Sequence, residues 1–186
     1  MLSFINNCNR MINKSSFKLK VLLKGTPDAA KDNLFQKFIK SRFERDYKLT
    51  VGVDILIMDV EYEKGEIATL SIWDLGSQKR YEFMQNRFYK GAVAVLLIFD
   101  LSREETYTEA INWLTEIKQF AGSIPFILIG NNVDLVESKD KTRIQKEARE
   151  FAKNEGGFYI ETSPTKIDIV EDTIRLLTRK IIEIRY

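Results

Sequence analysis

Histidine is absent from the 186-residue sequence, and cysteine occurs once, as Cys8. Without histidine the chain has no Ser-His-Asp triad, no histidine general base and no histidine metal ligand. A single cysteine allows no disulfide within the chain. No apolar run approaches the roughly 20 residues that a membrane-spanning helix needs. The net charge of +2 is too small to indicate a nucleic-acid partner.

Most of the sequence shows strand-like and helix-like apolar patterns in alternation. Strands are predicted where polar and apolar residues alternate or where a short segment is apolar throughout. Helices are predicted where apolar residues recur every three or four positions. The predicted strands are residues 17–24, 51–62, 66–74, 92–100, 125–131 and 157–163, and the predicted helices are 31–41, 104–121, 141–154 and 167–184. This order predicts one α/β domain over residues 17–186, with helices on both faces of a mostly parallel sheet.

Residues 1–16 precede the first predicted strand and contain no acidic side chain. We expect a leader that is loosely attached to the domain. A weak amphipathic helix is a second interpretation, because Leu2, Ile5 and Cys8 share one face at helical spacing. A targeting peptide is a third, because such peptides are poor in acidic residues. Leu2 and the cysteine-free end of the sequence carry no lipidation motif, so we expect any membrane contact to come from residues 1–16 or from a partner.

Polar residues follow four of the predicted strands. Ligands of open α/β sheets bind at the carboxyl ends of the strands, so these four loops form the candidate site. The first loop, GTPDAAKD at residues 25–32, matches the phosphate-binding pattern G-x-x-x-x-G-K-[ST] at two of its four fixed positions. The other loops are residues 74–78, 131–134 and 162–165. Each loop alone is a weak signal, and the prediction depends on their order and spacing.

Taken in order, these segments resemble the Ras superfamily of small GTPases, and most closely its Rab-like branch, over residues 17–184. FKLKVLLKG is similar to the first strand and the start of the phosphate loop, and YKLTVGVDI to the first switch region. LSIWDLGSQKRYEFMQNRFYKGA is similar to the second switch, LIGNNVDL to the guanine-reading motif N-K-x-D, and ETSPTK to the last base-contacting loop. The resemblance implies a P-loop GTPase domain with a six-stranded sheet, one antiparallel edge strand and about five helices on both faces.

The resemblance assigns a role to each matching position. Gln78 stands where the family orients the attacking water, and Lys31 stands where a lysine contacts the β- and γ-phosphates. Asp32, Thr50 and Asp74 stand at the positions that hold Mg²⁺. The implied nucleotide-binding residues are Gly25, Asp28, Ala29, Ala30, Lys31, Asp32, Asn33, Ser77, Asn131, Asn132, Asp134, Ser163, Pro164 and Thr165. The implied cofactors are GTP or GDP with Mg²⁺.

The aspartate of the guanine-reading motif explains the expected base. Asp134 offers two acceptor oxygens, which suit the N1–H and 2-amino donors of guanine, and adenine presents neither arrangement. Asn132, in contrast, replaces the lysine of N-K-x-D and loses the long stem that covers the base. Pro164 has no N–H to donate to guanine O6. The base side of the site is therefore expected to select guanine with fewer contacts than usual.

The phosphate side also departs from the family pattern. Ala30 replaces a glycine that lies against the phosphates, where a Cβ is costly. Asp28 and Asp32 place two negative charges in a cradle that works through positive potential. Ser77 replaces the second-switch glycine whose N–H meets the γ-phosphate. Together these changes favour weakened nucleotide binding and slow GTP hydrolysis.

Three functions stay open at this point. The first is a guanine-nucleotide switch in which GTP orders Thr50 and residues 74–90. The alternative is a pseudo-GTPase interaction module with little or no nucleotide, and a binder of another nucleotide is a third. Regulators or effectors would bind the switch and hairpin surface, with Tyr81, Phe83, Phe88 and Tyr89 as candidate anchors. We expect a cytoplasmic monomer that is at most peripherally bound to membranes.

Overall fold

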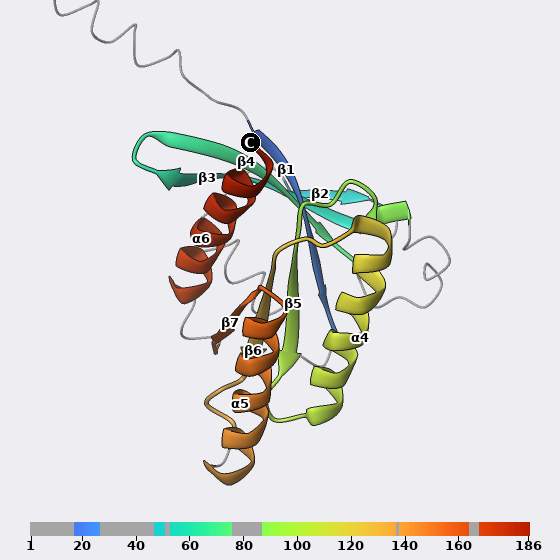
Figure 1. Ribbon diagram of the computed structural model, residues 1–186, viewed down its shortest axis with the longest axis vertical. Coiled ribbons are helices and arrows are strands. Elements are labelled where there is room, and N and C mark those ends of the chain that lie inside the picture. Colours follow the sequence, from blue (N-terminus) through green and yellow to red (C-terminus); the bar gives the residue numbers. More distant parts are fainter. Residues whose placement is uncertain (1–16, 27–46, 51–52, 76–86, 137, 164–167) are drawn as a thin grey trace, which may run out of the picture.

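The computed structural model describes residues 17–26, 47–50, 53–75, 87–136, 138–163 and 168–186 (Figure 1). The leader and the predicted helix at 31–41 lie outside these ranges. Within the described ranges, each predicted strand and helix is found in the predicted order, and one further strand occurs at Tyr47–Thr50. The alternation of the two periodicities therefore located all but one of the strands in this part of the chain.

One sheet of seven strands forms the centre of the structure. The strands are β1 (Phe17–Gly25), β2 (Tyr47–Thr50), β3 (Val53–Glu63), β4 (Glu66–Asp74), β5 (Ala94–Asp100), β6 (Phe126–Asn131) and β7 (Phe158–Glu161). Their order across the sheet is β2-β3-β4-β1-β5-β6-β7. β3 runs antiparallel to both of its neighbours, and each of the other adjacent pairs is parallel. The predicted α/β class with a mostly parallel sheet is confirmed.

The strand count differs from the expected six because the first switch region contributes a strand of its own. β2 pairs with the start of β3, from Tyr47 opposite Leu56 to Thr50 opposite Val53. This short strand, rather than β3, forms the edge of the sheet. β3 and β4 form the predicted hairpin around Lys64 and Gly65, and Gly65 adopts a φ of 82° that favours glycine.

Three long helices cover the two faces of the sheet within the described residues. They are α4 (Glu104–Ala121), α5 (Ser138–Asn154) and α6 (Asp168–Arg185). α4 and α5 pack on one face and α6 packs on the other (Figure 1). Helices on both faces are what parallel strands require, because the crossover connections bury both sides of the sheet.

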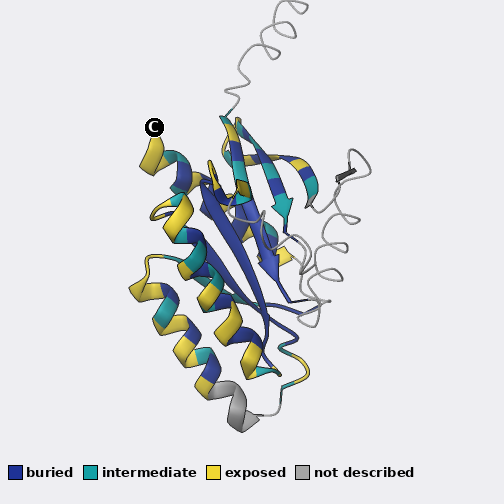
Figure 2. Cartoon of the chain, turned by 90° about the vertical axis from the view of Figure 1, so that its right-hand side faces the viewer, coloured by how far each residue is buried: buried dark blue, intermediate teal, exposed yellow. Residues whose placement is uncertain are grey.

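The sheet separates two hydrophobic cores, which Figure 2 shows as buried strands between partly exposed helices. The α6-side core contains Leu19, Val21, Leu23, Leu70, Ile72, Leu96, Ile98, Ile174, Leu177 and Ile181, among others. The α4-side core contains Leu22, Tyr89, Val95, Leu97, Phe99, Tyr107, Leu114, Phe126, Ile144 and Ala148, among others. β5 contributes to both cores, since all seven of its residues are buried.

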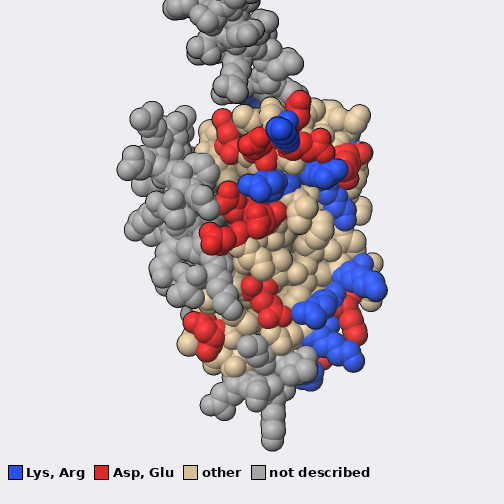
Figure 3. Space-filling model, turned by 90° about the vertical axis from the view of Figure 1, so that its left-hand side faces the viewer, with Lys and Arg blue, Asp and Glu red and all other residues tan. Residues whose placement is uncertain are grey.

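The side of the molecule that carries α6 and the β3–β4 hairpin has a mixed charge. Figure 3 shows acidic and basic side chains on this side, with no single sign covering it. Arg179 on α6 contacts Glu63 of the hairpin at 3.2 Å and Glu183 of its own helix at 3.0 Å. Among the helices in the described ranges, none is long and apolar enough to cross a bilayer.

Candidate functional site

Five parallel strands end at one edge of the sheet, and the candidate loops begin there. The pairing of neighbouring strands sets their ends side by side, with Asp100 at the end of β5 opposite Asn131 at the end of β6. The last residues of these strands, in order across the sheet, are Asp74, Gly25, Asp100, Asn131 and Glu161. The structure therefore brings the starts of all four predicted loops to the same edge.

The end of β1 approaches its neighbours closely. A Cβ added to Gly25 would lie 2.8 Å from the carbonyl oxygen of Ile98 on β5, which is closer than real Cβ atoms come to a backbone oxygen. On the other side, the N–H of Leu75 donates to the carbonyl oxygen of Leu23 at 3.0 Å. Glycine is thus required at the start of the predicted phosphate loop for strand packing, whatever the loop binds.

The rest of the predicted phosphate and magnesium site is described only in part. Residues 28–33, 77, 78, 164 and 165 lie outside the described ranges, so the roles expected for them stay predictions. Thr50 is the last residue of β2. Asp74 is partly buried at the end of β4 and lies opposite Asp54 of β3. Of the predicted magnesium ligands, only the Asp74 side chain is thus placed at the site edge.

The base-reading loop, residues 131–135, is fully described. Asn131 is inaccessible to solvent, Asn132 is buried, and Asp134 is exposed. The N–H of Val133 donates to the carbonyl oxygen of Thr162 at 3.2 Å, which joins this loop to the end of β7. Ser163, also predicted as a site residue, is buried directly after Thr162. The two predicted base-side segments therefore do meet in space.

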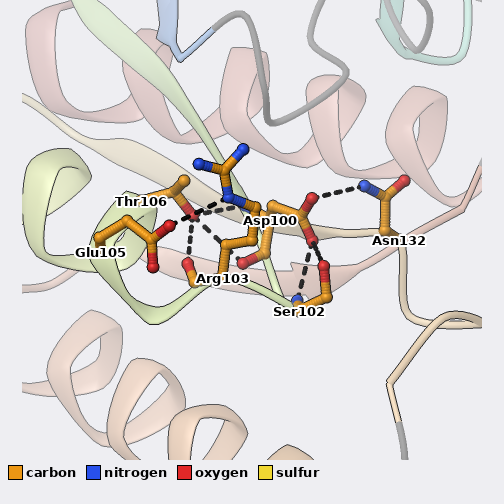
Figure 4. Close-up of polar contacts among 6 residues, drawn as sticks. All are labelled: Asp100, Ser102, Arg103, Glu105, Thr106 and Asn132. Carbon is orange, nitrogen blue, oxygen red and sulfur yellow. Dashed lines mark hydrogen bonds and ion pairs between the residues drawn. The ribbon is translucent and has the colours of Figure 1, made fainter.

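Asp100 is a site-edge residue that the sequence analysis did not identify (Figure 4). Its carboxylate is buried, with one oxygen accepting hydrogen bonds from the N–H of Ser102 at 2.8 Å and the Ser102 hydroxyl at 2.6 Å. The other oxygen accepts from Nδ2 of Asn132 at 2.9 Å. The signal was available, because Asp100 ends an apolar strand just as Asp74 does.

The backbone around Asp100 is tied to the start of α4. The Thr106 hydroxyl accepts from the N–H of Asp100 at 2.9 Å and lies 2.7 Å from the carbonyl oxygen of Arg103, to which it donates. Thr106 is itself buried, so these contacts are shielded from water. They fix the turn between β5 and α4, and with it the position of the Asp100 carboxylate.

Lys24 is a buried cation directly before Gly25, and its position was not predicted. Its Nζ donates to the hydroxyl of Tyr89 at 2.8 Å and lies 5.0 Å from the ring centroid of Trp113 on α4. Tyr89 is inaccessible to solvent, so among the four candidate anchors it is a core residue and not an exposed one. The pKa of Tyr89 is raised, first by burial and then by the charge of Glu116 and its hydrogen bond. Its hydroxyl therefore stays protonated at neutral pH.

A second lysine of β1 contacts the same segment. Nζ of Lys20 donates to the carbonyl oxygen of Lys90 at 3.1 Å and lies 3.9 Å from the ring centroid of Trp73. Burial lowers the pKa of Lys20 below its ordinary value. Lys20 and Lys24 thus attach residues 89 and 90, at the end of the predicted second switch, to β1.

The described residues at this edge fit a guanine base. The base-reading loop contains a buried amide at Asn131 and an exposed carboxylate at Asp134. It is hydrogen-bonded to the end of β7. Carboxylate acceptors suit the paired donors of guanine, which adenine lacks. The acidic side chain also makes this end of the edge unsuited to an anion. The phosphates would then have to lie toward Gly25, where the predicted phosphate loop begins.

Comparison with known proteins agrees with this arrangement. Residues 20–183 match the sequence profile described as Ras family. The chain is 34% identical over 156 residues to human Ras-related protein Rab-30, covering 83% of this chain and 75% of that protein. It is also 34% identical over 170 residues to RABA4b of Arabidopsis thaliana, covering 90% and 74%, and 32% identical over 176 residues to Rab11A of Lotus japonicus, covering 92% and 75%.

Proposed function

This chain belongs to the Ras family of small GTPases and is Rab-like within it, and from this premise we propose that it is a guanine-nucleotide-dependent switch with weakened nucleotide binding and slow GTP hydrolysis. The observation that carries the proposal is the base-reading loop, in which Asn131 ends β6 and Val133 is hydrogen-bonded to Thr162, the residue before Ser163. Members of the Ras family generally use GTP or GDP with Mg²⁺.

The proposed roles on the phosphate side follow the family pattern. Lys31 and the backbone of residues 28–33 would hold the phosphates, with Gly25 and Ser77 at the borders. Asp32, Thr50 and Asp74 would hold Mg²⁺, which neutralises developing negative charge during phosphoryl transfer. Gln78 would orient the attacking water. On the base side, Asn132, Pro164 and Thr165 would border the guanine that Asp134 reads.

Electrostatics support weakened binding. Two like charges 4 Å apart repel by about 4 kcal/mol at an effective dielectric constant of about 20. If Asp28 and Asp32 acted on the phosphates in full, that energy would lower affinity about a thousandfold. Mg²⁺ bound by Asp32 would offset part of the loss. Ala30 adds a steric cost where the family has glycine.

A pseudo-GTPase interaction module is the alternative, and a surface on the β2–β4 side of the sheet favours it. Ile55, Trp73 and Phe88 are only partly buried there, and the rings of Trp73 and Phe88 lie 6.2 Å apart. Ile57 on β3 is 42% exposed. Aromatic and aliphatic side chains of this kind suit a protein partner. In either case we propose a cytoplasmic monomer, recruited to membranes at most by a partner or by residues 1–16.

The deciding experiment identifies the nucleotide that the purified full-length chain carries. Denaturation followed by ion-exchange chromatography should release guanine nucleotide in clearly less than a one-to-one ratio, and titration with GDP and Mg²⁺ should show weaker binding than is usual for the family. ADP should bind more weakly than GDP. Full occupancy by tightly held GTP or GDP would contradict weakened binding, and equal affinity for ADP would contradict the guanine assignment.

Two variants test the cause of the weakened binding. Ala30→Gly combined with Asp32→Ser restores the family pattern and should raise GDP affinity at least about tenfold, since relief of roughly 1.4 kcal/mol of repulsion is enough for that. Asp134→Asn should lower GDP affinity, because an amide replaces one acceptor oxygen by a donor. Asp172→Asn on the exposed face of α6 is the matched control and should change neither value. No binding in any variant would favour the interaction module.

A further inference from the structure

We infer that Asp100 is a positioning residue for the base-reading loop and that it acts through Asn132 (Figure 4). The two side chains come from different strand ends, β5 and β6, and form what we call the Asp100–Asn132 latch. The inference rests on the proposed function, because the loop reads a base only in a chain that binds a nucleotide. It gives Asn132 a role, although Asn132 replaces the lysine of the family motif.

The latch is buried and directional. Asp100 is 4% exposed and Asn132 is 8% exposed, and Nδ2 of Asn132 lies 2.9 Å from Oδ2 of Asp100. A hydrogen bond to a carboxylate is among the stronger ones in proteins, and shielding from water increases its value. The other carboxylate oxygen is held by Ser102, so the acceptor that faces Asn132 has a fixed direction.

The latch holds the backbone of Asn132 in a left-handed conformation. Asn132 has a φ of 59°, which is left-handed, and it is the only non-glycine residue in the described ranges with a positive φ. Asparagine tolerates this conformation better than most residues, and a lysine there has no comparable local compensation. The turn lets the N–H of Leu135 donate to the carbonyl oxygen of Asn132 at 3.0 Å.

The consequence is a base-reading loop whose shape is set by the protein. Asn132 lies between Asn131 and Asp134, the two residues proposed to contact the base. Asn132 is hydrogen-bonded to Asp100 and Val133 to Thr162, so contacts within the protein hold the loop in its shape. A loop that is already ordered loses less conformational freedom on binding. The latch thus offsets part of the affinity that is lost with the lysine stem.

Hydrogen exchange of the nucleotide-free protein tests the latch directly. In Asn132→Asp two carboxylates face each other, so exchange of the amides of residues 132–135 should become at least about tenfold faster, as loss of one hydrogen bond to a charged group predicts. Combining Asp100→Asn with Asn132→Asp restores one carboxylate and one amide, and protection should return. Glu105→Gln is the control, because Glu105 is an exposed carboxylate at the start of α4 that pairs with Arg103, and its replacement should leave these amides protected.

Base discrimination is the second readout, and a merely structural role would not move it. IDP lacks the 2-amino group that Asp134 is proposed to read, so the ratio of GDP to IDP affinity reports the position of the loop. This ratio should fall at least about threefold in Asn132→Asp, because a displaced loop would weaken the hydrogen bond between the 2-amino group and Asp134. It should recover when Asp100→Asn is combined with Asn132→Asp. Asn132→Gly, which suits the left-handed φ, replaces Asn132→Asp if the latter does not fold.

Three outcomes decide the matter. Unchanged exchange in both Asn132 variants would overturn the inference. Faster exchange with an unchanged ratio of GDP to IDP affinity would overturn the positioning role. Faster exchange that is rescued by the double variant, in a chain that binds neither GDP nor IDP, would support the latch while contradicting the proposed function.

Discussion

The two faces of β1 are built from different chemistry. On the α6 side, Leu19, Val21 and Leu23 pack into an aliphatic core. On the α4 side, Leu22 packs among aromatic rings, and Lys20 and Lys24 flank it with ammonium groups. Aliphatic packing has no preferred direction, whereas each ammonium group is held by particular acceptors and rings. We therefore expect the α6 side of β1 to contribute mainly to stability and the α4 side to fix the positions of the residues that contact Lys20 and Lys24.

Lys20 and Lys24 fix the position of the end of the predicted second switch. Lys20 contacts the carbonyl oxygen of Lys90, and Lys24 contacts the hydroxyl of Tyr89. In addition, the N–H of Val93 donates to the carbonyl oxygen of Lys20 at 2.9 Å. The segment that would change conformation in a switch therefore has a fixed end. We expect changes on the two faces to differ in size and in kind.

The largest effect is expected on the α6 side. Leu177→Ala removes a fully buried side chain and should lower the free energy of unfolding by about 3 kcal/mol, from lost burial and the cavity left behind. The matched control is Leu176→Ala on the same helix, which is 53% exposed and should change it by less than about 0.5 kcal/mol. Urea denaturation measures both. Similar losses at the two positions would mean that α6 is not held by its buried face.

A smaller and more selective effect is expected on the α4 side. Tyr89→Phe removes the hydroxyl that accepts a hydrogen bond from Lys24. It should lower the free energy of unfolding by about 2 kcal/mol, which is typical for loss of a hydrogen bond to a charged group. The same change should cost clearly less when Lys24→Met is already present. A double-mutant cycle by urea denaturation measures this difference. Strictly additive losses would show that Lys24 and Tyr89 do not depend on each other.

The smallest effect concerns the surface between α4 and α5. Arg143 forms a hydrogen-bonded ion pair with Glu104, and this hydrogen bond and charge lower the pKa of the Glu104 carboxyl. Because the pKa of Glu104 is lower in the folded protein than its ordinary value of 4.5, the pair stabilises the fold at pH values above 4.5. This stabilisation is lost as the pH falls through the pKa of the folded protein. Arg143→Gln should therefore make the loss of thermal stability over this acid range slightly shallower.

The control for this change lies on the same helix. Lys146 is paired with Glu150 at 4.0 Å, and both side chains are largely exposed. Lys146→Gln should leave the acid dependence of the melting temperature as it is in the unchanged protein, because exposed pairs of this kind contribute little. An equal change in the two variants would point to a general charge effect and not to the Arg143–Glu104 pair.

The fold was largely predictable because its periodicities are strong. Residues 92–99 and 126–130 are apolar throughout, and the structure buries them between helices on both faces. The hairpin was predictable from Lys64 and Gly65. β2 was not, because four alternating residues are too few to predict a strand, and this strand forms through pairing with β3. Local pattern cannot report an edge strand that depends on its neighbour.

The site was predictable where residue type and position agree. Asn131 ends β6 and Asp134 follows it, and the N–H of Val133 joins this loop to the carbonyl oxygen of Thr162 after β7. The contact between Lys24 and Tyr89 was not predicted, because a lysine at the end of a strand is usually exposed. Each is buried only because the other, with Trp113, supplies a partner. A contact between residues far apart in the sequence, such as Lys24 and Tyr89, produces no periodic pattern from which it could be predicted.

The two outermost strands of the sheet, β2 and β7, contain four residues each. Unpaired backbone groups at a sheet edge can template the addition of strands from other molecules, and a short edge offers few of them. The long apolar strands β5 and β6 lie inside these short borders, away from any such template. The architecture thereby protects its most aggregation-prone segments from intermolecular pairing once the chain has folded.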